Sequence, residues 1–241
     1  MTNMAVLIQG ELQRMKRYNI FSGGAVVALL WVAVLYFLDA SMTAAIFQTF
    51  LYVDITSMPI LLVGVALFYE RQEGSLKAIL VSPVSKAGYL LSKLAALLVS
   101  SLFTLVLLYS FAYYFRDFRA QTLGLVAAVL IIATFHVLFG ILLTFHSKNF
   151  TSLLMRVMLY MFVFLLPVLL SELGLISQPF LKNLLYIAPT KASMELLGSV
   201  TQTTLGSGFW YGLLYLTAAI GITFKLVLRG FAAFAEKEGG I

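Results

Sequence analysis

Six long apolar runs, separated by short polar segments, set the pattern of this chain. A helix needs about 20 residues, each advancing about 1.5 Å, to cross the ~30 Å hydrocarbon core of a bilayer. Each run is about that long or longer, so the pattern predicts an all-α membrane protein with six transmembrane helices. We expect a single transmembrane domain over residues 1–241, with spans at approximately 20–38, 44–69, 89–115, 122–145, 152–171 and 208–228.

Two segments outside these runs carry enough apolar residues to form shorter helices. Residues 4–19 mix apolar and charged positions as an amphipathic helix in the membrane interface does, although a disordered cationic tail is the alternative. Residues 172–207 are rich in Leu, Ile and Tyr, and a structureless loop of that length would be unusual. We therefore expect short helices there that dip into the outer interface, with residues 190–200 as one candidate.

The composition agrees with a membrane protein and excludes several other classes. Hydrophobic residues make up 61% of the chain and charged residues 11%, about half the usual share for a soluble domain. The absence of cysteine excludes disulfide bonds and cysteine-ligated metals. The sequence also lacks the phosphate-loop pattern GxxxxGK(S/T) and the HExxH and GxSxG catalytic motifs. We expect a chain that is not an enzyme and binds no cofactor, so that ATP-driven transport would need another polypeptide.

The net charge of +6 is distributed in a way that predicts the orientation of the spans. With the N-terminus inside, twelve Lys and Arg residues fall in inner segments or at inner helix ends, and four fall outside. This bias favours a cytoplasmic location for both termini and for residues 70–86, in the plasma membrane of a prokaryote. It explains the positive charge better than nucleic-acid binding does. Lys93, near an inner helix end, is expected to extend its amine toward the interface.

Two polar residues within the predicted spans are candidates for a transport path. Asp54 lies at membrane depth, because a span that began after it would keep only about 15 residues. It would contact substrate, a proton or an ion, or it would cap a helix break together with Ser57 before Pro59. Either way, we expect the second span to be discontinuous. His136 can relay protons, but an interhelical hydrogen bond is favoured because no second His or carboxylate stands at ligand spacing.

The segment of residues 70–86 interrupts the apolar chain with five charged residues. Leu76, Ile79 and Leu80 recur at i, i+3 and i+4, so a short helix here would carry one apolar stripe. Pro83 would end that helix, because it lacks a backbone N–H group. We call residues 70–86 the coupling segment below; the alternative is a solvated loop with ordinary turn residues.

The coupling segment resembles the signature of ABC-2 type permeases, the membrane subunits of ABC exporters. The resemblance covers about 25 residues, ending at a lysine some ten positions beyond the proline, and the matching residues are Glu70, Arg71, Gly74, Ser75, Leu76, Leu80, Ser82, Pro83, Ser85 and Lys93. A weaker match is the proline-containing stretch of residues 184–192, before the last span. The chain is most similar in general character to the small permeases grouped with fluoroquinolone and other drug exporters.

The resemblance implies partners and a mechanism. Two permeases would pair, as two copies or as paralogues, and two ABC ATP-binding subunits holding ATP and Mg would dock beneath them. The coupling segment would then form a coupling helix seated in the ATPase. The residues that would contact or orient the ATPase are Glu70, Arg71, Glu73, Gly74, Ser75, Leu76, Ile79, Leu80, Ser82 and Pro83. The exported compound would be small and hydrophobic or amphipathic.

Two other classes of function compete with this interpretation. An ion- or proton-coupled secondary carrier would use Asp54 and His136 and would transport without an ATPase. A membrane scaffold or immunity protein would show no flux even with an ATPase present. The presence of a neighbouring gene for an ATP-binding protein would favour the exporter.

Overall fold

The computed structural model describes residues 4–39, 42–75, 82, 84–202 and 206–239. These residues form helices joined by short connections, with no strand among them. Six helical stretches in this part of the chain are long and apolar enough to cross a membrane, which confirms the predicted fold class. They are Ile20–Phe37, Ile46–Gln72, Lys86–Arg116, Thr122–Phe145, Phe150–Glu172 and Ser207–Phe231.

Three helical elements coincide with candidate spans, and two extend beyond theirs. Their bounds are α1 (Met4–Arg17), α2 (Ile20–Phe37), α3 (Thr43–Gln72), α5 (Lys86–Arg116), α6 (Thr122–Phe145), α7 (Phe150–Tyr160), η2 (Met161–Leu165), α8 (Leu166–Glu172), α9 (Pro179–Leu185), α10 (Pro189–Thr201) and α11 (Ser207–Gly239). The elements α7, η2 and α8 together make up the fifth candidate span. A helix therefore forms near the N-terminus as predicted, whereas its location in the membrane interface stays a prediction.

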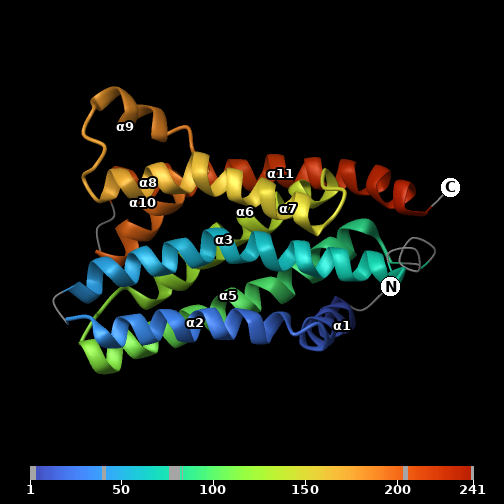
Figure 1. The fold of residues 1–241 in the computed structure, drawn as a ribbon, viewed down its shortest axis with the longest axis horizontal. Helices are drawn as coiled ribbons and strands as arrows, with labels where there is room; N and C mark the ends of the chain where they lie inside the picture. Colours follow the sequence, from blue (N-terminus) through green and yellow to red (C-terminus); the bar gives the residue numbers. More distant parts are fainter. Residues whose placement is uncertain (1–3, 40–41, 76–81, 83, 203–205, 240–241) are drawn as a thin grey trace.

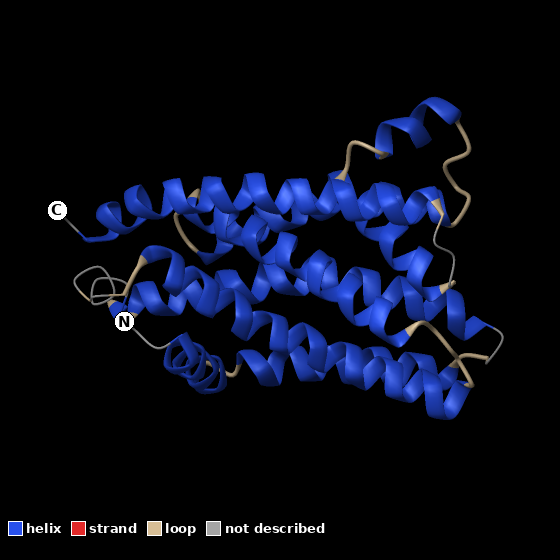
Figure 2. Ribbon diagram, turned by 180° about the vertical axis from the view of Figure 1, so that it is seen from behind, coloured by secondary structure: helices blue, strands red, loops and turns tan. Residues whose placement is uncertain are grey.

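The helices form an elongated bundle with α3 and α6 packed against each other in the middle (Figure 1). Helices α2 and α5 lie on one side, α7 packs on α3, and α11 packs on α6. Both views place α1 and the C-terminal half of α11 toward one end of the bundle, and α9 and α10 at the opposite end (Figure 2). The two ends therefore differ: α1 lies at one end, and the short helices α9 and α10 lie at the other.

Helix α3 continues through the proline near its centre, so the predicted discontinuity of the second span is wrong. Pro59 removes only one backbone donor, and membrane helices tolerate this loss where neighbouring helices and hydroxyl side chains compensate. Thr56 and Ser57 both donate their hydroxyls to carbonyl oxygens one turn earlier in α3, at 2.6 Å for Thr56. Both hydroxyls therefore form hydrogen bonds within a continuous helix, and Ser57 does not cap a helix break.

The fifth candidate span widens into a π-helix at Met161–Leu165, just before Pro167. A π turn is a common way to accommodate a local disruption of the α-helical ladder, and a proline N–H is missing here. The hydroxyl of Thr190 in α10 donates to the carbonyl oxygen of Phe164 in this turn, at 2.6 Å. The irregular turn is therefore tied to the short helix α10.

The long connection between the fifth and sixth spans contains two short helices, as predicted. Helix α9 has no buried residue and projects from the bundle (Figure 1). Helix α10 covers the predicted residues 190–200, but most of it is buried against α3, α6 and α11. The second helix therefore belongs to the packed bundle, and how deep either helix lies in the membrane stays a prediction.

A glycine of α11 permits α10 to pack closely. Gly208 and Gly212 match the GxxxG spacing that lets membrane helices approach each other. A Cβ atom on Gly212 would lie 2.6 Å from the carbonyl oxygen of Ala192 and 2.8 Å from the Cβ of Leu196, both in α10. The space between α10 and α11 at this point therefore admits glycine but not a residue with a side chain. On the same helix, Gly221 has no atom within 4 Å of the corresponding position.

We predict that Gly212→Ala destabilises the protein by about 1–3 kcal/mol, because the added methyl forces α10 and α11 apart. The matched control is Gly221→Ala, which adds the same methyl to the same helix in open space and should leave stability unchanged or slightly higher. Thermal unfolding of the purified protein in detergent measures both. Equal unfolding midpoints for the two variants would contradict the close contact.

Candidate functional site

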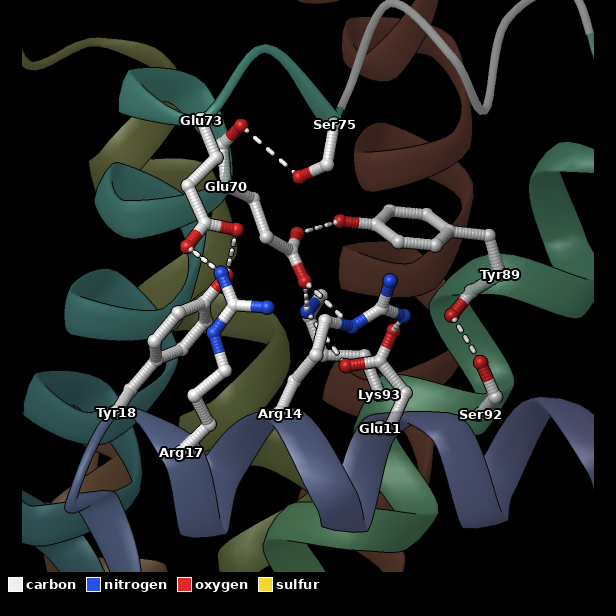
Figure 3. Close-up of polar contacts among 10 residues, drawn as sticks. All are labelled: Glu11, Arg14, Arg17, Tyr18, Glu70, Glu73, Ser75, Tyr89, Ser92 and Lys93. Atoms are coloured by element: carbon white, nitrogen blue, oxygen red, sulfur yellow. Dashed lines mark hydrogen bonds and ion pairs between the residues drawn. The ribbon is translucent and has the colours of Figure 1, made fainter.

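A cluster of buried charged side chains lies where α1 crosses the ends of α3 and α5. Glu11 and Arg14 come from α1, Glu70 from the last turns of α3, and Tyr89 and Lys93 from the first turns of α5 (Figure 3). We call these five residues the charge cluster. Glu70 and Lys93 belong to the family signature; Glu70 is the first residue of the coupling segment, and Lys93 follows the segment in sequence. The cluster therefore joins the end of α3 and the start of α5, between which the coupling segment runs in sequence, to the N-terminal helix α1.

Lys93 is at the centre of the charge cluster. Its Nζ lies 2.6 Å from Oε1 of Glu70 and 2.9 Å from Oε2 of Glu11. Arg14 pairs with Glu11 one turn earlier in α1, and its Nε lies 3.5 Å from Oε1 of Glu70. The hydroxyl of Tyr89 donates to the other oxygen of Glu70. Every oxygen of the two carboxylates therefore has a partner.

Burial makes these contacts strong and makes each of them hard to lose. The exposed fractions are 2% for Glu11, 0% for Glu70 and 1% for Lys93. Removing a charge from water costs several kcal/mol, and the cost is offset only where the charges are matched and hydrogen-bonded. Two carboxylates face two cations here, so the formal charge of the cluster is zero. The cluster is a rigid joint rather than a reactive centre.

A second set of contacts extends the joint toward the surface. Glu73, just after α3, pairs with Arg17 and accepts a hydrogen bond of 2.5 Å from the hydroxyl of Tyr18. The Tyr18 hydroxyl, and then Arg17, hold the pKa of Glu73 below its usual range. Burial and the bond to Glu73 raise the pKa of Tyr18 to about 12. The ring of Tyr18 also stacks on Tyr69, with centroids 4.8 Å apart. The end of α1 is therefore held on the end of α3.

The start of the coupling segment is a glycine turn. Gly74 has a φ of +70°, in the left-handed region that favours glycine, and its N–H donates to the carbonyl oxygen of Arg71 at 3.2 Å. Ser75 Oγ donates to the carbonyl oxygen of Glu70 at 3.1 Å. Gly74 thus ends α3 as a C-terminal glycine commonly does, and it turns the chain out of the helix.

The other end of the coupling segment is a serine cap. Ser85 precedes α5, and its Oγ accepts the N–H of Gly88 at 3.1 Å. The Oγ of Ser82 accepts the N–H of Val84 at 3.4 Å. Arg71, back at the end of α3, donates to the carbonyl oxygen of Lys148 at 3.1 Å. Of the family-signature residues, Gly74 therefore ends α3 and Ser85 begins α5.

The apolar stripe predicted for the coupling helix lies outside the described residues. This applies to Leu76, Ile79, Leu80 and Pro83. Their helix, and their contact with an ATPase, stay predictions.

The two candidate transport-path residues, Asp54 and His136, have different hydrogen-bond partners. Asp54 is 3% exposed, and its Oδ1 accepts the indole N–H of Trp31 in α2 at 3.2 Å. His136 is fully buried, with Nε2 3.1 Å from the hydroxyl of Tyr160 in α7. The predicted interhelical hydrogen bond of His136 is confirmed. No hydrogen bond or ion pair links Asp54 to His136 among the described residues, and each contacts a different helix.

Sequence reasoning missed part of the charge cluster and misjudged another part. Lys93 was expected to extend toward the interface, but its amine is buried between two carboxylates. Glu11, Arg14 and Tyr89 were not predicted as site residues. The one available signal was the i, i+3 spacing of Glu11 and Arg14 on an amphipathic segment, and that spacing does not reveal the distant partner 82 positions away. Within the described residues, no group of His, Asp and Glu side chains could hold a metal ion.

Comparison with known proteins identifies relatives over most of the chain. The sequence profile of the Fluoroquinolones export permease protein family matches residues 2–237. Two curated proteins, each named a fluoroquinolones export permease protein, come from the CDC 1551 / Oshkosh and H37Rv strains of Mycobacterium tuberculosis. Each is 26% identical over 199 residues, which is 83% of this chain and 81% of the relative.

We predict that Lys93→Met destabilises the protein by about 3–5 kcal/mol, because it leaves two buried carboxylates without their shared cation. The control is Lys225→Met, which removes an exposed lysine from α11 and should change stability by less than about 0.5 kcal/mol. Chemical or thermal unfolding in detergent measures the difference. Adding Glu70→Gln to Lys93→Met should restore part of the loss. Equal stability of the two lysine variants would show that the cluster contributes little.

Proposed function

Because the chain belongs to the Fluoroquinolones export permease protein family, we propose that it is the membrane subunit of an ATP-driven exporter. It forms the path for a small hydrophobic or amphipathic compound, such as a fluoroquinolone, as the names of its relatives suggest. A separate ABC ATP-binding subunit binds and hydrolyses ATP with Mg. Two permease chains, identical or paralogous, complete the membrane part. Both termini and the coupling segment face the cytoplasm of a prokaryotic cell.

The observation that carries this proposal is the charge cluster, which links the end of α3 to the start of α5, on either side of the coupling segment. An ATPase that moves this segment must pull on α3 and α5 together, because the segment joins them. The ion pair of Glu70 and Lys93 locks the two helix ends to each other at 2.6 Å, and Glu11 adds α1 to the same unit. A rigid unit transmits a displacement into the bundle, whereas a flexible loop would absorb it.

The distribution of charged contacts supports the same assignment. Glu73 is already engaged by Arg17 and Tyr18, so it orients α1 on α3 and contributes little to an ATPase surface. Gly74 and Ser85 set the angles at which the chain leaves α3 and enters α5. The docking surface itself would then consist of the apolar stripe of Leu76, Ile79 and Leu80, presented at a fixed place by this frame.

We predict that Gly74→Pro abolishes coupling to the ATPase. Proline restricts φ to about −65° and has no N–H group, whereas Gly74 has a φ of +70° and donates to Arg71. Gly174 is a matched control at the opposite end of the bundle, since its φ is +76° and it donates to Ser171 at 3.0 Å. Gly174→Pro introduces the same backbone conflict away from the proposed docking site.

The measurement is reconstitution with a candidate ABC ATP-binding subunit. Co-purification reports association, and transport-stimulated ATP hydrolysis in proteoliposomes reports coupling. Gly74→Pro and Leu80→Asp should each lose at least about 90% of the stimulated hydrolysis, while Gly174→Pro keeps ATPase association. If Gly74→Pro and Leu80→Asp keep full association and coupled transport, the coupling segment is assigned wrongly.

The burial of Asp54 is the observation that favours a secondary carrier, because a buried carboxylate within a membrane span is often functional. We predict that Asp54→Asn keeps ATP-dependent transport within about threefold, since asparagine can still accept the hydrogen bond from Trp31. Flux from proteoliposomes with and without ATPase measures this. Flux that follows a proton gradient without ATPase, and disappears in Asp54→Asn, would instead establish a carrier; no flux in any arrangement would favour a scaffold.

A further inference from the structure

A cleft lies at the end of the bundle opposite the charge cluster. It has a volume of about 390 Å³ and adjoins a second hollow of about 240 Å³. The two hollows share four lining residues from α3, α8 and α10 and the residue after α10, namely Gln48, Glu172, Met194 and Gln202. We call this continuous depression the outer cleft. Its size is within the range of pockets that hold small organic molecules.

Part of the outer cleft is lined by apolar side chains, one of which is aromatic. Leu169 and Leu173 line it from α8 and just beyond, Met194 from α10, and Phe118 from the connection between α5 and α6. Such a surface gains free energy by covering a flat hydrophobic ligand. Methionine adapts its shape to different ligands because its side chain is unbranched and polarizable.

The charged side chains of the outer cleft are acidic. Glu172 and Glu195 line the smaller hollow with side chains that are 41% and 25% exposed. Lys191 lies behind them, 11% exposed, with its Nζ 2.8 Å from each carboxylate. Burial alone would lower the pKa of Lys191, but the two carboxylates raise it above its ordinary value. The group therefore carries one net negative charge, and neither Lys nor Arg stands among the described lining residues.

The polar groups of the outer cleft are held in place before any ligand arrives. Gln48 donates to Sδ of Met194 at 3.4 Å and accepts the hydroxyl of Thr201 at 3.1 Å. A Cβ atom on Gly198 would lie 3.0 Å from Nε2 of Gln48. A larger residue at position 198 would therefore push the amide of Gln48 away from its observed place.

A glycine also lies beside one of the carboxylates. A Cβ atom on Gly208 would lie 2.5 Å from Oε2 of Glu195, so a larger residue there would displace that carboxylate. Oε1 of Glu195 accepts the hydroxyl of Tyr186 at 3.4 Å and contacts Lys191. A preorganised group loses little entropy when a ligand binds to it.

We propose that the outer cleft binds small amphipathic organic cations, with the amine beside Glu172 and Glu195 and the apolar body against Phe118 and Met194. This inference deepens the proposed function. It rests on that function for one point, namely that an exported cation leaves the protein from this cleft. The net negative charge holds a cation more strongly than an anion of the same shape. Gln48 and Gln202 also line the cleft, and their amide groups do not discriminate between a cation and an anion.

A binding experiment tests the charge preference without any ATPase. The probes are ethidium, a flat lipophilic cation, and 1-anilinonaphthalene-8-sulfonate, an anion of similar size. Fluorescence polarisation measures their binding to the full chain in phosphatidylcholine nanodiscs, with empty nanodiscs as the blank. Glu172→Gln and Glu195→Gln each leave Lys191 with one carboxylate, so the fold is retained. Each should weaken ethidium binding at least about fivefold, the effect of one unit charge at close range in water, and should not weaken anion binding.

A labelling experiment tests the location, and it benefits from a chain with no cysteine. Leu173 and Leu175 are both 71% exposed, but only Leu173 is among the described residues that line the cleft. Saturating ethidium should slow maleimide labelling of Leu173→Cys at least about fivefold. It should leave the labelling rate of Leu175→Cys unchanged.

The outcomes separate this inference from the proposed function. Unchanged ethidium affinity in both glutamine variants, or equal protection of the two cysteines, would overturn the outer cleft as a cation site even if ATP-driven export is observed. Selective loss of ethidium binding with selective protection of Leu173→Cys would support the site even if no ATPase couples to the chain. Protection by the anion as strong as by ethidium would overturn the charge preference.

Discussion

The amine of Lys93, held between the carboxylates of Glu11 and Glu70, is the contact on which one end of this bundle depends. Three helices that lie apart in sequence meet at this single atom, and none of the three charges is accessible to water. Such a contact is unforgiving, because loss of any partner leaves an uncompensated buried charge. The same property makes the joint suitable for transmitting force, since it has one stable arrangement.

The two ends of the molecule use charge in opposite ways. At the charge cluster two cations and two anions balance, so Glu11, Glu70 and Lys93 can all be buried. At the outer cleft two carboxylates face one lysine, and the carboxylates remain partly exposed because a net charge must stay near water. A balanced group stabilises a joint, whereas an unbalanced group at a cleft attracts a ligand of opposite charge.

Close backbone approach is the second constraint on the bundle, and glycine provides it. In α6, a Cβ atom on Gly140 would lie 2.8 Å from Cα of Ile60 in α3, so the central pair of helices is in contact there. Gly212 does the same for α10 and α11. In a membrane the apolar surface of one helix gains little from another helix that it would not gain from lipid, so tight packing and interhelical hydrogen bonds must hold the bundle together. The bond between His136 and Tyr160 is one such hydrogen bond.

Local chemistry explains which predictions succeeded. The six spans follow from length and apolarity, which a bilayer imposes on any crossing helix. The interhelical bond of His136 follows from the cost of leaving a buried imidazole without a partner. The break at Pro59 was wrongly predicted because a proline beside Asp54 and Ser57 looks like a helix end in sequence. A membrane helix tolerates a single proline, and α3 is continuous through Pro59.

The sequence by itself determined the class of the protein and its six spans, since each depends on residues that are close together along the chain. Only the tertiary structure decided that Glu11 reaches Lys93, that Asp54 and His136 bond to different helices, and that Glu172 and Glu195 share Lys191 at one cleft. The physical reason is that a charge in an apolar setting must find a partner. The packing of distant helices selects which one it finds.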